Sequence, residues 1–248
     1  GESKIQQMIV DAIPDWPEAV ELGFRASLPI VDVKLTTRSV EGERQRENCL
    51  TQLRQLLGAH IISWDAPYEP ATTLPQRVVS LLQHQSKTLT TAESCTGGLI
   101  ASQITAISGA SSVFEMGVVS YSNKIKHQLL GVDPIVIERH GAVSEEVVRQ
   151  MAIGALTQSG SDFAIAVSGI AGPDGGTDEK PVGTVWIAWG DAQNIDAEIL
   201  YFPGSRQYFQ HVVAAVGLDL IRRRLLNIGE PPLYFKQRKF KANKAKGA

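Results

Sequence analysis

The chain has 248 residues, enough for one large domain or two of moderate size. Hydrophobic residues make up 43%, and 24 Lys and Arg against 26 Asp and Glu leave a formal charge of −2. This composition is typical of a soluble globular protein and argues against a general attraction to nucleic acid. No stretch has the length of a transmembrane span, and no signal peptide is visible.

Two cysteines, Cys49 and Cys95, lie in different segments. They are too few for a disulfide framework, and without paired His or Cys spacing they form no zinc motif. A reducing, cytoplasmic location is therefore expected. The chain begins with Gly1 rather than Met, which is compatible with a fragment or a processed chain.

Residues 1–72 are predicted to form a small α+β domain. Apolar spacing indicates helices at 5–13 and 43–57, and alternation indicates strands at 19–27 and 31–37, with a third strand at 60–63. This order resembles the K-homology topology. A K-homology domain grips nucleic acid with a G-x-x-G loop, which this region lacks. The favoured interpretation is a K-homology-like domain that does not bind nucleic acid, with RNA or DNA binding as the alternative.

Residues 64–70 are rich in proline and indicate a domain boundary. Residues 73–227 then alternate between helical and strand patterns, which predicts a three-layer α/β/α domain with a roughly five-stranded sheet. The strands are expected at 87–92, 117–122, 163–168, 183–189 and 197–202, and the helices at 74–84, 99–107, 123–130, 144–156 and 206–226. Residues 228–248 are predicted to be a disordered basic tail, with a nucleic-acid-binding arm as the alternative.

The most informative stretch is Thr91-Ala-Glu-Ser-Cys-Thr-Gly-Gly98. It is a polar corner between a strand and a helix, where open α/β sheets place their ligand sites. It presents Ser94 and Cys95 as candidate nucleophiles, and Ser94 or Thr96 is expected to cap the helix. The alternative is a purely structural turn, because the stretch matches neither the G-x-S-x-G elbow nor the P-loop.

A second polar junction, Ser120-Tyr-Ser-Asn-Lys-Ile-Lys126, contains candidate bases for a serine nucleophile. If the two strands are neighbours, Tyr121, Lys124 or Lys126 comes within reach of Ser94. A lysine can act as a base when burial or a nearby cation keeps it neutral. For either lysine taken alone, the favoured interpretation is a solvated helix position.

A third junction, residues 168–176, carries four glycines and can bring backbone N–H groups close to an anion. Arg206 opens the last helix, where it can meet a phosphate or carboxylate or be an ordinary surface arginine.

Taken together, these motifs resemble the CinA (competence/damage-inducible protein) family. The resemblance covers about residues 73–227, which are similar to the carboxyl-terminal nicotinamide mononucleotide deamidase domain of that family. It is carried by residues 91–98, Tyr121-Ser-Asn123, His140-Gly-Ala-Val-Ser144, residues 168–176 and Lys180-Pro-Val-Gly-Thr-Val-Trp186. Full-length members also have a first domain associated with ADP-ribose pyrophosphatase activity. The given sequence does not include that domain, so the activity is not assigned here.

The resemblance implies that Ser94 is the nucleophile, Lys126 its general base, and Tyr121 an assisting residue. The pattern Y-S-N-x-x-K selects Lys126 over Lys124. The implied reaction releases ammonia and nicotinic acid mononucleotide without metal or cofactor, in a homodimeric protein that acts on a small nucleotide and has no membrane partner. The expected substrate contacts are Thr96, Gly97, Gly98, Gly172 and Arg206.

Two alternatives remain open from the sequence. One is a nucleotide-binding regulatory module that lacks turnover, and the other is a thiol hydrolase that uses Cys95.

Overall fold

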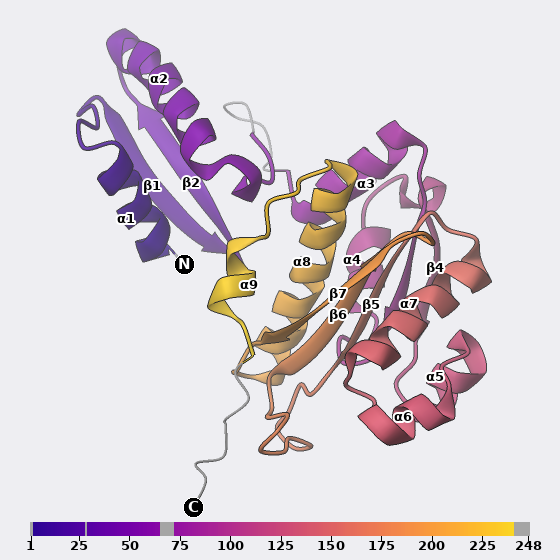
Figure 1. Cartoon of the computed structure of the whole chain (residues 1–248). Coiled ribbons are helices and arrows are strands. Elements are labelled where there is room, and N and C mark those ends of the chain that lie inside the picture. The colour runs from indigo at the N-terminus through magenta and orange to yellow at the C-terminus, as the bar shows by residue number, and fades with distance from the viewer. Residues whose placement is uncertain (1, 28, 65–71, 241–248) are drawn as a thin grey trace, which may run out of the picture. The chain divides into compact units, whose positions relative to one another are not determined.

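The computed structural model describes residues 2–27, 29–64 and 72–240 (Figure 1). The chain divides into two compact units, Gly1–Trp64 and Asp65–Ala248. The predicted linker at 64–70 lies outside the described residues, except for Trp64.

The first unit is a two-stranded antiparallel sheet with two helices. Its elements are α1 (Glu2–Ala12), β1 (Val20–Ser27), β2 (Ile30–Thr37), α2 (Val40–Leu57) and the 3-10 turn η1 (Gly58–His60). Leu22 lies opposite Leu35 and Phe24 opposite Val33, so apolar pairs share one face of the sheet. Ser39 caps α2 by accepting a hydrogen bond from the N–H of Gly42.

The third strand predicted at 60–63 is wrong. Gly58, with a φ of 44°, ends α2 and leads into the 3-10 turn, and residues 61–64 form no strand. A run this short and apolar has no period that distinguishes a strand from irregular structure. The described part of this unit therefore has the order α1-β1-β2-α2 and lacks the third strand of the predicted K-homology-like topology.

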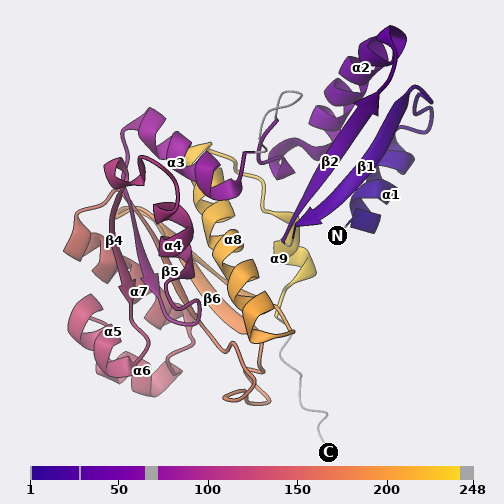
Figure 2. The same ribbon diagram turned by 180° about the vertical axis from the view of Figure 1, so that it is seen from behind.

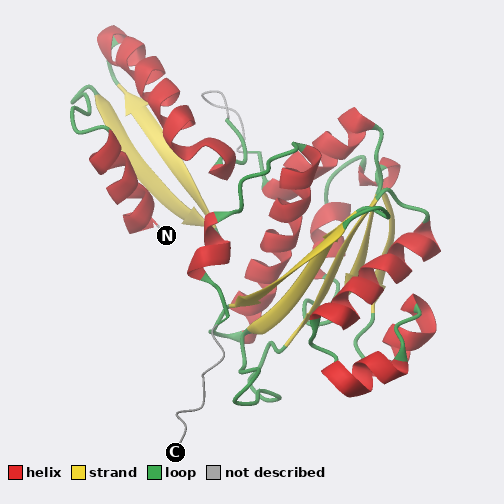
Figure 3. Ribbon diagram, in the orientation of Figure 1, coloured by secondary structure: helices red, strands yellow, loops and turns green. Residues whose placement is uncertain are grey.

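The second unit contains a five-stranded mixed sheet in the order β4-β3-β5-β6-β7 (Figure 3). β3 runs parallel to both β4 and β5, whereas β6 and β7 are antiparallel to their neighbours. The strands are β3 (Leu89–Glu93), β4 (Phe114–Val119), β5 (Phe163–Gly169), β6 (Thr184–Gly190) and β7 (Ile195–Tyr201).

Helices cover both faces of this sheet, which confirms the three-layer α/β prediction (Figures 1 and 2). Ile165 of β5 packs toward Gly217 of α8, whereas its neighbours Ala164 and Ala166 join the apolar cluster under α7. The helices are α3 (Leu74–Gln85), α4 (Leu99–Thr105), α5 (Asn123–Leu130), α6 (Pro134–His140), α7 (Glu145–Ser159) and α8 (Arg206–Leu225), with a 3-10 turn at Ala110–Ser112. Helix α6 was not foreseen, although Asp133 and Pro134 are a common helix start.

The prediction of a disordered tail is wrong for its first part. Helix α9 (Leu233–Gln237) forms there, and the N–H of Tyr201 donates to the carbonyl of Arg238 at the free edge of β7. The ring of Phe235 packs on that of Trp189, with 6.0 Å between centroids. These aromatic residues supply the apolar area that orders the segment. Residues 241–248 lie outside the described part of the chain.

The packing of α7 against α5 predicts that Gly154→Ala is destabilising. A Cβ at residue 154 would collide with the carbonyl group of Leu130, which is backbone and cannot rotate away. Alanine gains about 1 kcal/mol in helix propensity over glycine, but overpacking typically costs 1–3 kcal/mol, with the upper end (~3 kcal/mol) expected against backbone. We expect urea denaturation of Gly154→Ala to show a free energy of unfolding about 2 kcal/mol below that of the wild type. The control is Gly229→Ala, where a Cβ meets nothing within 4 Å; equal stabilities of the two variants would contradict the prediction.

Candidate active site at the carboxyl ends of β3 and β4

Two polar corners meet where the parallel strands β3 and β4 end. Glu93 pairs with Val119 in the register of the two strands, so Ser94 and Ser120 leave the sheet side by side. The N–H of Ser120 donates to the carbonyl of Glu93 (2.8 Å), and the N–H of Ser94 donates to Val167 of β5 (3.1 Å). The sheet therefore fixes the start of both corners.

The structure brings Ser94 and Lys126 together. Their Oγ and Nζ atoms are 3.2 Å apart, and the same Nζ donates to the carbonyl of Ser120 at 2.8 Å. Lys126 lies on the inward side of α5 and is 1% exposed. Ser122 caps that helix by accepting from the N–H of Ile125, which fixes the turn that carries the lysine.

Burial makes Lys126 a suitable base. Loss of solvation lowers the pKa of its amine below the ordinary 10.5, and the smaller opposing effect comes from the neighbouring Cys95. A neutral amine has a lone pair that can accept the proton of a serine hydroxyl. The pair therefore consists of the two chemical groups that serine catalysis needs, a hydroxyl and an amine with a lowered pKa.

Cys95 is a poor nucleophile in this environment. Burial is the main cause that raises the pKa of its thiol to about 12, and Glu93 adds to the effect while Lys126 and Arg206 oppose it. Thiol chemistry proceeds through the thiolate, which is scarce at neutral pH when the pKa is this high. Burial therefore argues against the thiol alternative.

The sequence predicted that Ser94 or Thr96 caps α4. This prediction is wrong, because neither residue is at the N-cap. The N-cap residue is Gly98, whose φ of 94° suits glycine, and the carboxylate of Glu93 accepts from the first turn instead. The hydroxyl of Thr96 donates to Glu93 at 2.6 Å, and the residue is 3% exposed. What Thr96 offers a substrate is therefore its backbone.

The corner after Ser94 has four backbone N–H groups, at residues 95 to 98, and two of them have no acceptor in another described residue. The N–H of Gly97 donates to the carbonyl of Ser94 (3.1 Å) and that of Gly98 to Glu93 (3.1 Å). The N–H groups of Cys95 and Thr96 have no hydrogen bond to another described residue. These two groups are the candidates for an oxyanion hole beside the nucleophile.

Arg206 connects two other predicted site residues. Its guanidinium donates to the hydroxyl of Tyr121 (2.8 Å) and to the carbonyl of Gly172 (2.9 Å). Tyr121 is 60% exposed and, within the described part of the chain, makes no hydrogen bond to Ser94 or Lys126. The structure therefore groups Tyr121, Gly172 and Arg206 as a set distinct from the Ser94–Lys126 pair.

Two residues of the site were missed by the sequence analysis, namely Glu93 and Gln210. Gln210 of α8 donates from Nε2 to the carbonyl of Cys95 at 2.9 Å and so anchors the nucleophile corner from the helix layer. A glutamine near the start of a helix gives no sequence signal for such a contact. Glu93 directly follows the strand predicted at 87–92, and only its position before Ser94 hinted at a role.

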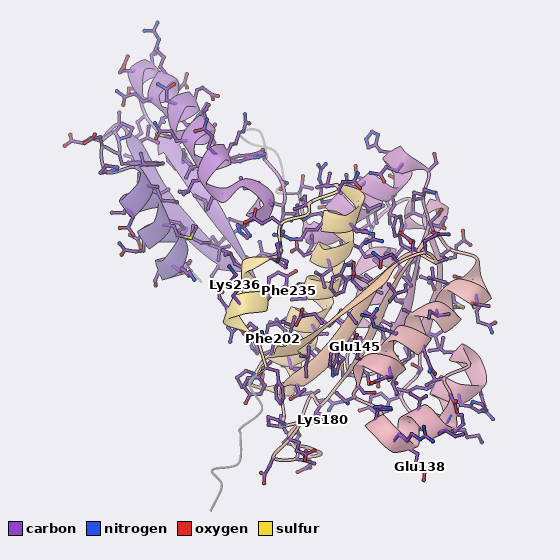
Figure 4. The ribbon with its side chains drawn as sticks, viewed as in Figure 1. Glu138, Glu145, Lys180, Phe202, Phe235 and Lys236 are labelled. Carbon is purple, nitrogen blue, oxygen red and sulfur yellow. The ribbon has the colours of Figure 1, made fainter. Side chains whose placement is uncertain are left out.

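The remaining motif residues hold the loops around the site. Lys180, labelled in Figure 4, donates to the carbonyls of His140 and Val143, both at 2.8 Å. Ser168 donates to the carbonyl of Ala142 at 2.6 Å, and Ser144 caps α7. These contacts tie the loop before α7 to the segments after β5.

The described residues contain no group of three or more His, Cys, Asp or Glu side chains placed to hold a metal ion. None of the helices in the described part of the chain has the length and apolar character needed to cross a membrane.

Comparison with known proteins places this chain in one family. Residues 71–225 match the family model of the CinA C-terminal domain. A CinA-like protein of Colwellia psychrerythraea is 50% identical over 240 residues, which cover 97% of this chain and 55% of that protein. A CinA-like protein of Akkermansia muciniphila is 45% identical over 229 residues, covering 90% and 53%. The chain thus spans about half the length of the curated relatives it matches.

Solved structures show the same fold. A CinA superfamily protein of Klebsiella pneumoniae superposes with a TM-score of 0.61 at 36% identity, covering 64% of this chain and 99% of that one. The competence/damage-inducible protein CihA of Agrobacterium tumefaciens gives 0.60 at 37% identity, covering 65% and 99%.

The burial of Cys95 predicts that its thiol resists alkylation in the folded protein. With the pKa of Cys95 raised to about 12 and the side chain buried, iodoacetamide at pH 8 should label Cys95 only as fast as the protein unfolds. Mass spectrometry of native and urea-unfolded protein measures the difference. Rapid labelling of Cys95 in the native state would contradict its burial and raised pKa, and would favour the thiol alternative.

Proposed function

The chain belongs to the CinA family, and on that premise we propose that its second unit is a nicotinamide mononucleotide amidohydrolase. The observation that carries the proposal is the Ser94–Lys126 pair, with 3.2 Å between Oγ and Nζ and an amine whose pKa burial lowers. A site that only binds a nucleotide has no need of a buried amine against a serine hydroxyl. The CinA match supports the family, and the pair supports the chemistry.

In the proposed reaction, Ser94 Oγ attacks the carboxamide carbon of the nicotinamide ring while Lys126 Nζ takes its proton. The tetrahedral adduct collapses when its C–N bond breaks, and the proton held by Lys126 passes to the departing amine, which leaves as ammonia. Water then attacks the acyl ester and gives its proton to Lys126. Cleavage of the ester, with return of the proton to Ser94 Oγ, releases nicotinic acid mononucleotide.

The backbone N–H groups of Cys95 and Thr96 are the proposed donors to the oxyanion of that adduct. Loss of one such donor typically costs ~3 kcal/mol of transition-state stabilisation. The proposed nucleotide contacts are Arg206 and the loop at Gly172, with backbone of Gly97 and Gly98. Arg206 already presents its guanidinium to an exposed tyrosine hydroxyl, and a phosphate would be a stronger acceptor for it. Tyr121 would then assist by orienting that arginine.

The alternative proposal is a nucleotide-binding regulatory module without turnover. It needs the Arg206 and Gly172 contacts but gives no role to the amine of Lys126. From the family resemblance we further propose a cytoplasmic homodimer that needs no metal or cofactor and has neither a membrane nor nucleic acid as its partner.

Replacement of the nucleophile should stop the reaction while sparing binding. We expect Ser94→Ala to lower ammonia release from nicotinamide mononucleotide by roughly 10³-fold or more, because no other group forms the acyl ester. Nucleotide affinity, measured by calorimetry without added metal, should stay near normal. The control is Cys95→Ala, which should retain full turnover. Nucleotide binding by the wild type without any ammonia release would instead favour the regulatory module.

Replacement of the proposed base should lower kcat, whereas replacement of the nearby Lys124 should not. We expect Lys126→Ala to reduce kcat at neutral pH by about 10²- to 10⁴-fold, the usual contribution of a general base. Lys124→Ala, an exposed position on the same helix, should leave kcat unchanged. In the wild type, kcat/KM should rise with pH as the Lys126 ammonium deprotonates, with the midpoint below 10.5 because burial lowers this pKa. A similar loss in both variants would remove Lys126 from this role.

A further inference from the structure

Glu93 is a completely buried carboxylate at the end of β3, directly before Ser94. All of its side-chain hydrogen-bond partners in the described residues are donors. None of the lysines or arginines in the described part of the chain forms an ion pair with it. Its charge is therefore balanced by backbone N–H groups and threonine hydroxyls, which suits an oxygen that only accepts.

The side chain of Glu93 organises the corner that follows the nucleophile. Oε2 accepts from the hydroxyl of Thr96 (2.6 Å) and the N–H groups of Gly98 (3.1 Å) and Ile100 (3.0 Å). Oε1 accepts from the N–H of Ala101 at 2.8 Å and, less closely, from Thr91 at 3.4 Å. One carboxylate thus fixes the chain on the far side of Ser94 over six residues, 96 to 101.

The main chain of Glu93 organises the other half of the pair. Its carbonyl accepts from the N–H of Ser120 at 2.8 Å, and the carbonyl of Ser120 accepts from Nζ of Lys126 at 2.8 Å. Ser94 is covalently attached to Glu93, and Lys126 is connected to it through one residue. Glu93 is therefore the point from which both reacting side chains are placed.

We propose that Glu93 is a positioning residue that sets the distance and direction between Ser94 Oγ and Lys126 Nζ. Burial of a charge is expensive, and apolar residues of similar volume often give equal or greater stability. A cap for α4 alone would require only a serine or aspartate at the N-cap. The reach of the Glu93 side chain, whose oxygens accept from residues 96 to 101, explains why a buried carboxylate stands here instead.

The kinetic part of the test rests on the proposed amidohydrolase activity. Glu93→Gln keeps the size of the side chain but turns an NH₂ group toward donors. We expect kcat to fall about 100-fold, the order of loss that small misplacements cause. KM should stay within about threefold, because the proposed contacts through Arg206 and Gly172 do not involve Glu93. The matched control is Asp162→Asn, a partly buried carboxylate that accepts from Lys87 (2.7 Å) and Thr88 (2.9 Å) at the opposite ends of β3 and β5. It should lose stability but keep kcat.

A second readout does not depend on the reaction. Amide hydrogen exchange should show the N–H groups of Gly98, Ile100 and Ala101 protected in the wild type, although the first turn of a helix usually exchanges quickly. Glu93→Gln should accelerate these amides at least about tenfold more than those of β5, and Asp162→Asn should not.

The outcomes separate cleanly. A folded Glu93→Gln variant with kcat within about threefold of wild type overturns the positioning role, as does rapid exchange of the three amides in the wild type. If Glu93→Gln does not fold, Glu93→Asp decides, because it keeps the charge but shortens the reach. Wild-type kcat in that variant overturns the role, and reduced kcat with a normal fold supports it. Absence of ammonia release from the wild type overturns the proposed function alone, since the exchange result still judges Glu93.

Discussion

The site depends on an amine that is buried without a carboxylate. Lys126 makes no ion pair among the described residues, and there its Nζ forms hydrogen bonds to a backbone carbonyl and a serine hydroxyl. An ammonium in such a place is costly, so the environment favours the neutral amine, and the cost is reflected in the lowered pKa. A lysine that served only stability would carry its charge to solvent or to a carboxylate. The burial of Lys126 is therefore the constraint that the surrounding loops are built to maintain.

The strand order explains how that environment arises. β3 lies between β4 and β5 in the sheet. After β3 the chain therefore forms the neighbouring strand on one edge of β3, which is β4, and then the neighbour on the other edge, which is β5. Such a switch point opens a crevice at the carboxyl ends of the strands, where ligands of α/β proteins bind. Ser94 lies at this point, Lys126 follows β4, and Gly172 follows β5. Parallel pairing therefore brings together residues that are far apart in sequence.

The sequence predicted the components of this site better than their connections. The corner at Ser94 was foreseen because a strand-to-helix junction is a local pattern, whereas Lys126 was selected over Lys124 only through the family resemblance. The five strands were foreseen from apolar runs. Glu93 and Gln210 were not, because each acts through contacts that depend on how layers pack. For the same reason the expected cap at Thr96 failed: a hydroxyl in the right place donates to a carboxylate whose position no local pattern reveals. Likewise, residues 60–63 and 233–237 were mispredicted, since tertiary contacts decide short segments.

The contacts also divide the site into parts with different physical demands. The Ser94–Lys126 pair is buried and held by the sheet, the carbonyl of Ser120 and the carboxylate of Glu93. Tyr121 and Arg206 are exposed and joined mainly to each other and to a loop. A reacting pair must be fixed before the substrate arrives, because reorganisation during the reaction raises the barrier. Contacts to a phosphate can instead exchange one acceptor for another. The proposed amidohydrolase would use both parts, the fixed pair for the reaction and the exposed groups for the nucleotide, whereas a module that only binds would use the exposed groups alone.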